Sequence, residues 1–226
     1  MLIEVPQLLN CEQIADCRAA IGKAAWIDGR GTAGDQSGAA KNNLQAREDD
    51  PHARRAGDLI LGALGTNPLF IAAALPLHVF PPLFSRYADA QSFGDHIDNA
   101  VRQIPDTRHR IRTDLSATVF LTPPEDYDGG ELVIADTYGS HSVKLPAGHM
   151  ILYPATSLHQ IRPVTRGARV SSFFWIQSMV RDDAQRTLLY NLDFAIQRLR
   201  RDHPDHASAI ETMSVYHNLV RMWAEV

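Results

Sequence analysis

A histidine and an aspartate two residues apart, His96 and Asp98, are the first candidates for chemistry in this sequence. In a strand, side chains at i and i+2 point to the same face, so this imidazole and this carboxylate could bind one metal ion. The spacing alone is weak evidence, because with 10 histidines in 226 residues a chance His-x-Asp triplet is expected. A second triplet, His203–Asp205, lies between two helix-like segments, where we expect capping and solvent-facing groups with Pro204 in a first helical turn.

Two further polar residues, His159 and Arg169, lie downstream in a region rich in strand-forming residues. Two imidazoles and one carboxylate on one face of a metal, with the other positions open, are typical of non-haem Fe(II) oxygenases. Both cysteines are far away in the sequence, which argues against a structural zinc site. His159 is the best candidate for a third ligand, although a lone histidine on an apolar strand is more often an ordinary core or surface residue.

Length and composition fit one globular chain of 226 residues with a sizeable core, 45% hydrophobic and 21% charged. The net charge of −4 and the absence of a long basic run argue against a nucleic-acid binder. No segment has the pattern of a signal peptide or a membrane span, so we expect a cytoplasmic protein without a membrane partner. Cys11 and Cys17 lie too far apart on a predicted helix for a disulfide and are expected to be small buried groups.

The N-terminal third is predicted to be mainly helical. An Asn-x-x-Gln cap precedes a helix over about 12–25, and two proline-initiated helices follow at about 51–65 and 68–75. Residues 28–43 are rich in glycine and small polar groups, which indicates a mobile loop or irregular hairpin that could act as a lid. Clustered prolines predict an extended segment at 77–87.

From Asp114 onwards the pattern changes to short strands joined by glycine-rich turns, which suggests a barrel or sandwich. The longest predicted strand is 169–180, whose aromatic residues are expected to be core and not to stack on a substrate. Two helices, at about 182–199 and from about 204, should form a hairpin against the body or a neighbouring subunit.

The sequence closely resembles the bacterial PKHD-type hydroxylases, a branch of the prolyl-4-hydroxylase-like Fe(II)- and 2-oxoglutarate-dependent dioxygenases. The matching stretches are FGDHIDNA (93–100), RTDLSATVFL (112–121), DYDGGEL (126–132), LHQIRPVTRGAR (158–169) and SFFWIQSMVR (172–181). The resemblance implies an α+β fold: a double-stranded β-helix (jelly roll) core with N-terminal supporting helices and a C-terminal helical hairpin. We accordingly expect a helical segment at 1–76, the dioxygenase jelly roll at 77–180 and C-terminal helices at 181–226.

The same resemblance implies roles for individual residues. It makes His96, Asp98 and His159 the iron ligands and Arg169 the anchor for the distal carboxylate of 2-oxoglutarate. A guanidinium suits the latter role, since it can donate two parallel hydrogen bonds to a carboxylate. Ser171, on the same strand face as Arg169, is a candidate for a further donor to the cosubstrate.

The sequence leaves the roles of two residues undecided. Tyr87 is a cosubstrate-binding candidate because related prolyl hydroxylases use a tyrosine at a comparable place, but an ordinary core tyrosine fits the sequence equally well. His149 stands where we expect an aspartate in relatives, which puts the local hydrogen bonding in doubt and leaves the metal triad unaffected.

The implied reaction uses Fe(II), 2-oxoglutarate and O2, releases succinate and CO2, and hydroxylates an unidentified substrate, with L-ascorbate restoring oxidised iron. A prolyl peptide and a small metabolite, linked in some relatives to iron uptake, are both open as substrates. The alternative is a non-catalytic jelly-roll protein that binds a metal or an acidic metabolite. The final helices could instead bind a peptide or form a homo-oligomer.

Overall fold

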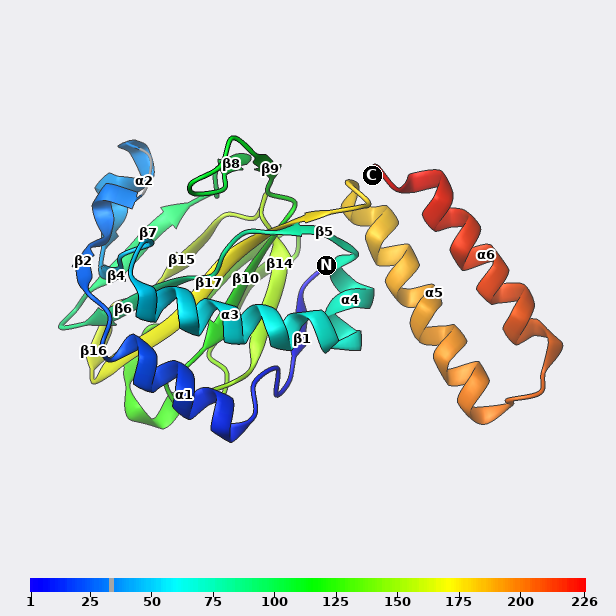
Figure 1. Ribbon diagram of the computed structural model, residues 1–226, viewed down its shortest axis with the longest axis horizontal. Helices are drawn as coiled ribbons and strands as arrows, with labels where there is room; N and C mark the ends of the chain where they lie inside the picture. The colour runs from blue at the N-terminus through cyan, green and yellow to red at the C-terminus, as the bar shows by residue number, and fades with distance from the viewer. Residues whose placement is uncertain (33–34) are drawn as a thin grey trace.

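Two antiparallel sheets form the centre of the fold (Figure 1). The computed structural model describes residues 1–32 and 35–226, with side chains described outside 32–37. The larger sheet has the strand order β1-β14-β10-β17-β6-β4-β2, with β5 also paired to β17, and the smaller sheet has the order β13-β12-β15-β7-β3. Two strand pairs, β8 with β9 and β11 with β16, complete the architecture. The expected α+β jelly roll with helices at both ends is confirmed.

The larger sheet consists of β1 (Ile3–Val5), β2 (Trp26–Asp28), β4 (Leu44–Ala46), β5 (Pro76–Val79), β6 (Leu83–Ala88), β10 (Leu115–Phe120), β14 (Met150–Pro154) and β17 (Ala168–Ser178). The smaller sheet consists of β3 (Lys41–Asn42), β7 (Ser92–His96), β12 (Leu132–Asp136), β13 (Gly139–Val143) and β15 (His159–Ile161). The short pairs are β8 (Val101–Gln103) with β9 (Arg110–Arg112), and β11 (Asp128–Gly129) with β16 (Val164–Arg166).

Three helices cover the outer face of the larger sheet: α1 (Cys11–Ile21), α3 (Pro51–Thr66) and α4 (Pro68–Ala74) (Figure 1). Each begins where a side chain accepts hydrogen bonds from the first backbone N–H groups, and Asn10 and Gln13 form the predicted reciprocal cap of α1. The side chains of each strand alternate between the face covered by these helices and the opposite face. On β10, Ala117 and Val119 pack in the cluster under the helices, whereas Phe120 belongs to the cluster on the opposite face.

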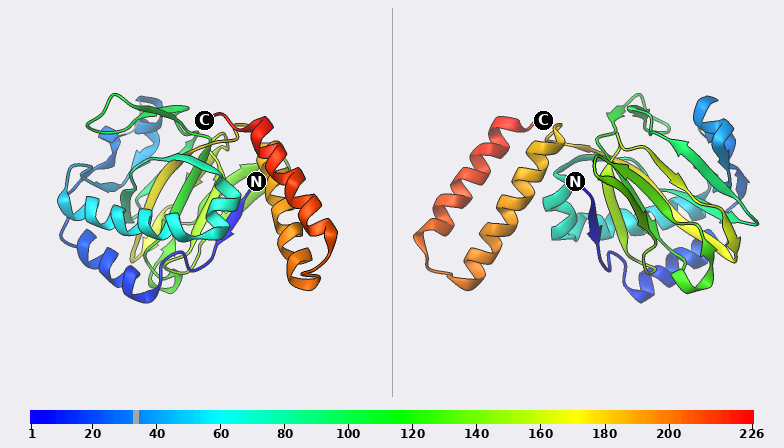
Figure 2. Two further views of the ribbon diagram at one scale, coloured as in Figure 1. Left: turned by 45° about the vertical axis from the view of Figure 1, so that its right-hand side comes forward. Right: turned by 180° about the vertical axis from the view of Figure 1, so that it is seen from behind.

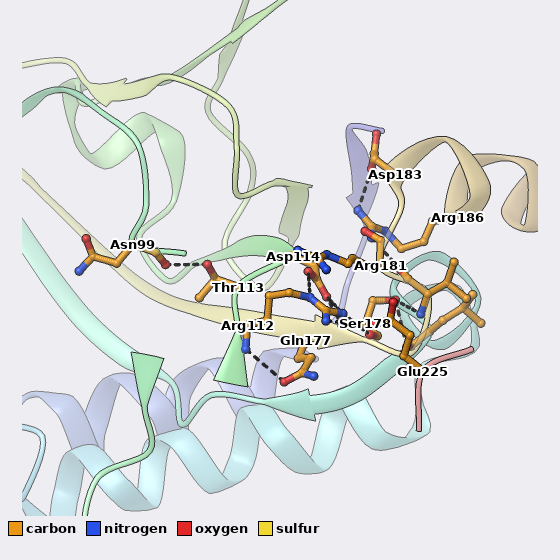
Figure 3. Close-up of polar contacts among 12 residues, drawn as sticks. Asn99, Arg112, Thr113, Asp114, Gln177, Ser178, Arg181, Asp183, Arg186 and Glu225 are labelled. Carbon is orange, nitrogen blue, oxygen red and sulfur yellow. Dashed lines mark hydrogen bonds and ion pairs between the residues drawn. The ribbon is translucent and has the colours of Figure 1, made fainter. Parts of the chain in front are cut away.

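The C-terminal hairpin of α5 (Asp183–Asp202) and α6 (Ala207–Trp223) projects from the body (Figures 1 and 2). Its base is attached through a small apolar cluster that includes Leu75, Leu189 and Trp223. Polar contacts add to this attachment, because Arg112 binds both Asp114 in the body and Glu225 at the end of the chain (Figure 3).

Several local predictions were wrong. The first helix ends at Ile21 and the last begins at Ala207, so Pro204 lies in the turn between α5 and α6 and not in a helix. Within the described part of 28–43, a 3-10 turn η1 (Gly29–Thr32), a short helix α2 (Asp35–Ala40) and β3 replace the predicted loop, and residues 33–34 lie outside the description. Strands also begin well before Asp114. Cys11 is exposed, while Cys17 is buried, and both thiols are free.

No single helix in the described residues is long and apolar enough to cross a membrane. The helices α3 and α4 together meet that length and composition, with a bend of 83° between them.

Candidate functional site

The two histidines and the aspartate singled out in the sequence meet at the smaller sheet. His96 ends β7 and His159 begins the neighbouring strand β15, and the two residues are paired in the register of these strands. Asp98 lies two residues beyond the end of β7. One nitrogen from each imidazole and one carboxylate oxygen all lie within 4.8 Å of one another. In the described residues this cluster contains no fourth histidine, cysteine or carboxylate.

Hydrogen bonds orient each of the three groups. His96 Nδ1 lies 2.8 Å from the Gly94 carbonyl, and His159 Nδ1 lies 3.0 Å from the Ser157 carbonyl. Because a carbonyl only accepts, both Nδ1 atoms carry the proton, and each Nε2 keeps its lone pair for a metal. The Asp98 carboxylate accepts a 2.6 Å hydrogen bond from Ser116 on β10.

Burial also favours the metal-binding form of His96. Desolvation, followed by the proximity of His159, lowers the pKa of His96 to about 4. The imidazole is therefore neutral at physiological pH, which is the form that ligates metals.

Arg169 lies on β17 of the larger sheet and is only 1% exposed. Its Nη1 donates a 2.7 Å hydrogen bond to Ser171, whose hydroxyl is 3.1 Å from that of Ser85. Its Nε and Nη2 have no hydrogen-bond partner among the described residues, and no described carboxylate pairs with it. A buried cation without an anion is unfavourable, so this arrangement fits a site that an acidic ligand completes.

Tyr87, on β6 opposite Arg169, is buried with its ring 5.6 Å from the guanidinium carbon. Burial raises the pKa of Tyr87 to about 12, so its hydroxyl stays protonated and can donate a hydrogen bond.

One cavity joins all six predicted site residues. Tyr87, Arg169 and Ser171 contribute from the larger sheet, and the two histidines and Asp98 contribute from the side of the smaller sheet. The cavity holds about 800 Å³ of empty space, part of it open to solvent.

Sequence reasoning missed four lining residues: Lys41, Arg102, Phe173 and Trp175. The expectation that the aromatic residues of β17 are core is confirmed for Phe174 and Trp175, which are buried in apolar clusters, and Phe173 packs against one of these clusters. All three also line the cavity, so a core position did not exclude a place in its wall. The available signal was the alternation along the strand, which puts Phe173 and Trp175 on the same face as Arg169.

Four other histidines lie outside this cavity. His149 Nδ1 is 2.9 Å from a Glu4 carboxylate oxygen, an ion-pair geometry at the opposite edge of the larger sheet. His141 lies 3.3 Å from Asp136, and the rings of His78 and His109 contact each other.

Comparisons with known proteins agree with this geometry. Residues 82–177 match the 2OG-Fe(II) oxygenase superfamily, and residues 183–225 match the PKHD-type hydroxylase C-terminal domain. A PKHD-type hydroxylase of Methylobacillus flagellatus is 60% identical over 226 residues, covering 100% of both chains. The PKHD-type hydroxylase PiuC of Pseudomonas aeruginosa is 57% identical, again over the full length of both.

Solved structures share the fold at low identity. A Pseudomonas putida prolyl-4-hydroxylase superposes with a TM-score of 0.50 at 21% identity, covering 78% of this chain and 92% of that one. The α-ketoglutarate-dependent epimerase SnoN from nogalamycin biosynthesis gives a TM-score of 0.54 at 15% identity, covering 79% and 78%.

These relationships do not favour the non-catalytic alternative. Relatives at this identity cover the chain from end to end, and the matched oxygenase family uses Fe(II) and 2-oxoglutarate. The chain belongs to the PKHD-type hydroxylases and is an enzyme, a dioxygenase of the Fe(II)- and 2-oxoglutarate-dependent class.

Proposed function

We propose that His96, Asp98 and His159 hold the Fe(II) ion. The supporting observation is the donor set itself: two imidazoles and one carboxylate within 4.8 Å of one another, with no thiolate among the described residues of the cluster. This set suits Fe(II) in a site that keeps positions open for other ligands. The Nδ1 hydrogen bonds and Ser116 hold the three groups in place before the metal binds.

Arg169 binds the distal carboxylate of 2-oxoglutarate in this proposal, assisted by the hydroxyls of Ser171 and Tyr87. The buried guanidinium has two nitrogens without a partner among the described residues, and a carboxylate can accept from both. The protonated Tyr87 and the Ser171 hydroxyl line the same end of the cavity. When bound, iron and 2-oxoglutarate together activate O2, forming succinate and CO2 and transferring one oxygen atom into a substrate C–H bond.

The protein's own contribution is position and exclusion of water. Asp98 is fixed by Ser116, Arg169 sets the depth of the cosubstrate, and apolar side chains close the cavity on the sheet side. The substrate is a prolyl peptide or a small metabolite, bound at the open end of this cavity.

Oxygen-dependent succinate formation from 2-oxoglutarate with added Fe(II) tests the assignment. Asp98→Ala should lose turnover while keeping its fold by circular dichroism, and Asp95→Ala, which removes an exposed carboxylate on the preceding strand β7, should keep turnover. Full turnover in Asp98→Ala would refute the ligand role. Ascorbate should raise the number of turnovers before inactivation, as expected if it restores oxidised iron.

We further propose that the chain works in the cytoplasm, since two free thiols fit a reducing compartment. In this proposal the chain has three parts: a helical segment at 1–76, the dioxygenase domain at 77–180 and C-terminal helices at 181–226.

The C-terminal hairpin is proposed as a contact between two copies of the chain. It exposes several large apolar side chains: Leu188, Phe194, Ile210, Val215 and Met222. Five exposed large apolar side chains on two projecting helices favour a surface that is covered by another chain. Sedimentation of the wild type and of an Ile210→Asp, Met222→Asp variant tests this, and a wild type that sediments as a monomer would refute it.

A further inference from the structure

An arginine at the Trp175 end of the cavity has no evident role in binding iron or 2-oxoglutarate. Arg102 lies on β8, is half-buried, and lines the cavity with its guanidinium carbon 4.1 Å from the centre of the Trp175 ring and 5.2 Å from that of Phe80. Its guanidinium makes no hydrogen bond or ion pair with the described residues. A guanidinium has five N–H donors, and stacking on a ring uses none of them.

The position of Arg102 separates it from Arg169. Arg169 and Trp175 lie on the same face of β17, six residues apart, which corresponds to roughly 20 Å of strand. In the proposed function, one carboxylate of 2-oxoglutarate binds Arg169 and the other end binds the metal. Both ends of 2-oxoglutarate then have their own partners, and Arg102 beside Trp175 is left for another group.

Lys41 on β3 brings a second positive charge to the same end of the cavity. Its Nζ lies 5.8 Å from the centre of the Phe173 ring and 5.4 Å from that of Phe93, and it donates a 2.9 Å hydrogen bond to Gln45. Phe173 and Trp175 are in edge-to-face contact, with ring centres 5.7 Å apart. The two cations therefore flank one continuous aromatic wall.

The charge balance of the cavity points the same way. Asp98 is the one acidic side chain among its described lining residues, against Lys41, Arg102 and Arg169. Fe(II) and the dianion of 2-oxoglutarate cancel each other's charge, and Asp98 offsets Arg169. Over these lining groups the loaded site thus keeps a net positive charge, which Glu48, an acidic group outside the lining that acts on both Arg102 and Lys41, reduces in part. In a partly dry site such charge attracts an anion strongly.

We propose that Arg102 and Lys41 bind an anionic group of the substrate, a carboxylate, while Trp175 and Phe173 contact its apolar part. This inference rests on the proposed function, because it names the substrate class of the same site. The carboxylate belongs either to a small organic acid or to the C-terminus of a peptide.

Calorimetry of the Fe(II) enzyme saturated with 2-oxoglutarate under nitrogen tests the proposal, with benzoate as the anionic probe and benzamide as its neutral counterpart. Benzoate should bind the wild type, and Arg102→Gln should weaken it at least about tenfold, as expected for loss of a charged hydrogen-bond donor. Arg110→Gln, which removes an exposed charge from the same β8–β9 pair, should leave benzoate affinity unchanged. Benzamide should bind weakly and equally to all three proteins.

Equal benzoate affinity in the wild type and Arg102→Gln, or no benzoate binding to the loaded wild type, would overturn the proposal. Should Arg102→Gln fold poorly, Arg102→Lys is the second variant. It keeps the positive charge but loses the planar guanidinium with its paired N–H donors, and it should bind benzoate with intermediate affinity. Ala-Ala-Phe as the free acid and as the amide distinguishes the two sources: preference for the free tripeptide assigns a peptide C-terminus, and preference for benzoate assigns a small acid. Failure of the proposed function is recognised separately. A preceding titration of the Fe(II) enzyme with 2-oxoglutarate would then show no binding.

Discussion

Ser116 Oγ donates a 2.6 Å hydrogen bond to Asp98 Oδ2, and this bond links the two sheets at the candidate metal centre. Ser116 is buried on β10 of the larger sheet, whereas Asp98 follows β7 of the smaller one. Asp98 is beyond the end of its strand, so the strand's backbone pairing does not fix it. Its orientation depends on this serine.

Ser116→Ala should therefore weaken Fe(II) binding by roughly 10- to 100-fold, the usual effect of losing a group that orients a metal ligand. Titration with Fe(II) under nitrogen, or with Mn(II) in air, measures the affinity. Ser172→Ala is the matched control, since it removes another buried serine hydroxyl, one that donates to the Leu83 carbonyl. Unchanged metal affinity in Ser116→Ala would show that Asp98 is held by other contacts.

Arg169 allows a second prediction, which separates a ligand-binding role from a structural one. Because the guanidinium is buried without an anionic partner among the described residues, Arg169→Met should leave the metal-free protein at least as stable as the wild type in urea unfolding. The same variant should raise the Kd of 2-oxoglutarate by roughly 10- to 100-fold or more. A large loss of stability together with normal 2-oxoglutarate binding would assign Arg169 to the core instead.

The sequence predicted which side chains come together better than it predicted the bounds of the segments around them. The candidate triad and Arg169 could be singled out because their residue types limit the chemistry and the matching motifs fix their positions. The role of Tyr87 could not be decided from the sequence, since a buried tyrosine looks the same there whether or not an arginine faces it. Here Arg169 lies directly opposite on the neighbouring strand.

Lys41 and Arg102 were missed for a related reason. Lys41 lies in a glycine-rich stretch with little periodicity, and its pairing with Phe93 across β3 and β7 is a contact between distant parts of the chain. Arg102 belongs to a three-residue strand, too short for an alternating pattern to show. The start of α6 was misplaced because Pro204 resembles a first-turn proline, whereas His206 provides the cap.

Arg112 bridges the body and the C-terminus, and its two ion pairs should differ in their effect on stability (Figure 3). The Asp114 side chain is 5% exposed and also accepts from the Ser178 amide, whereas the Glu225 side chain is 56% exposed. Arg112→Ala leaves a buried carboxylate without its cation and should lower the free energy of unfolding by about 2–3 kcal/mol. Glu225→Gln should lower it by less than about 1 kcal/mol. Equal losses in urea unfolding would contradict this ranking.

Anion binding by the Fe(II) enzyme saturated with 2-oxoglutarate should depend on pH through Lys41. Burial, followed by the charge of Arg102, lowers the pKa of Lys41 to about 8, although Glu48, Asp98 and Asp28 act in the opposite direction. The protonated amine attracts an anion, so benzoate affinity should be constant below this pKa and fall as the pH rises through it. Arg102 and benzoate stay charged throughout.

The fall should reach about tenfold between roughly pH 7 and pH 10, which corresponds to the loss of one of two cations at the site. Lys41→Gln should bind benzoate more weakly at neutral pH and show no such fall, whereas the exposed-charge control Arg110→Gln should retain it. A wild type whose benzoate affinity is flat over this range, or a Lys41→Gln variant that shows the same fall, would place the anion beyond the reach of Lys41. Arg102 alone would then bind it, because a guanidinium does not titrate in this range.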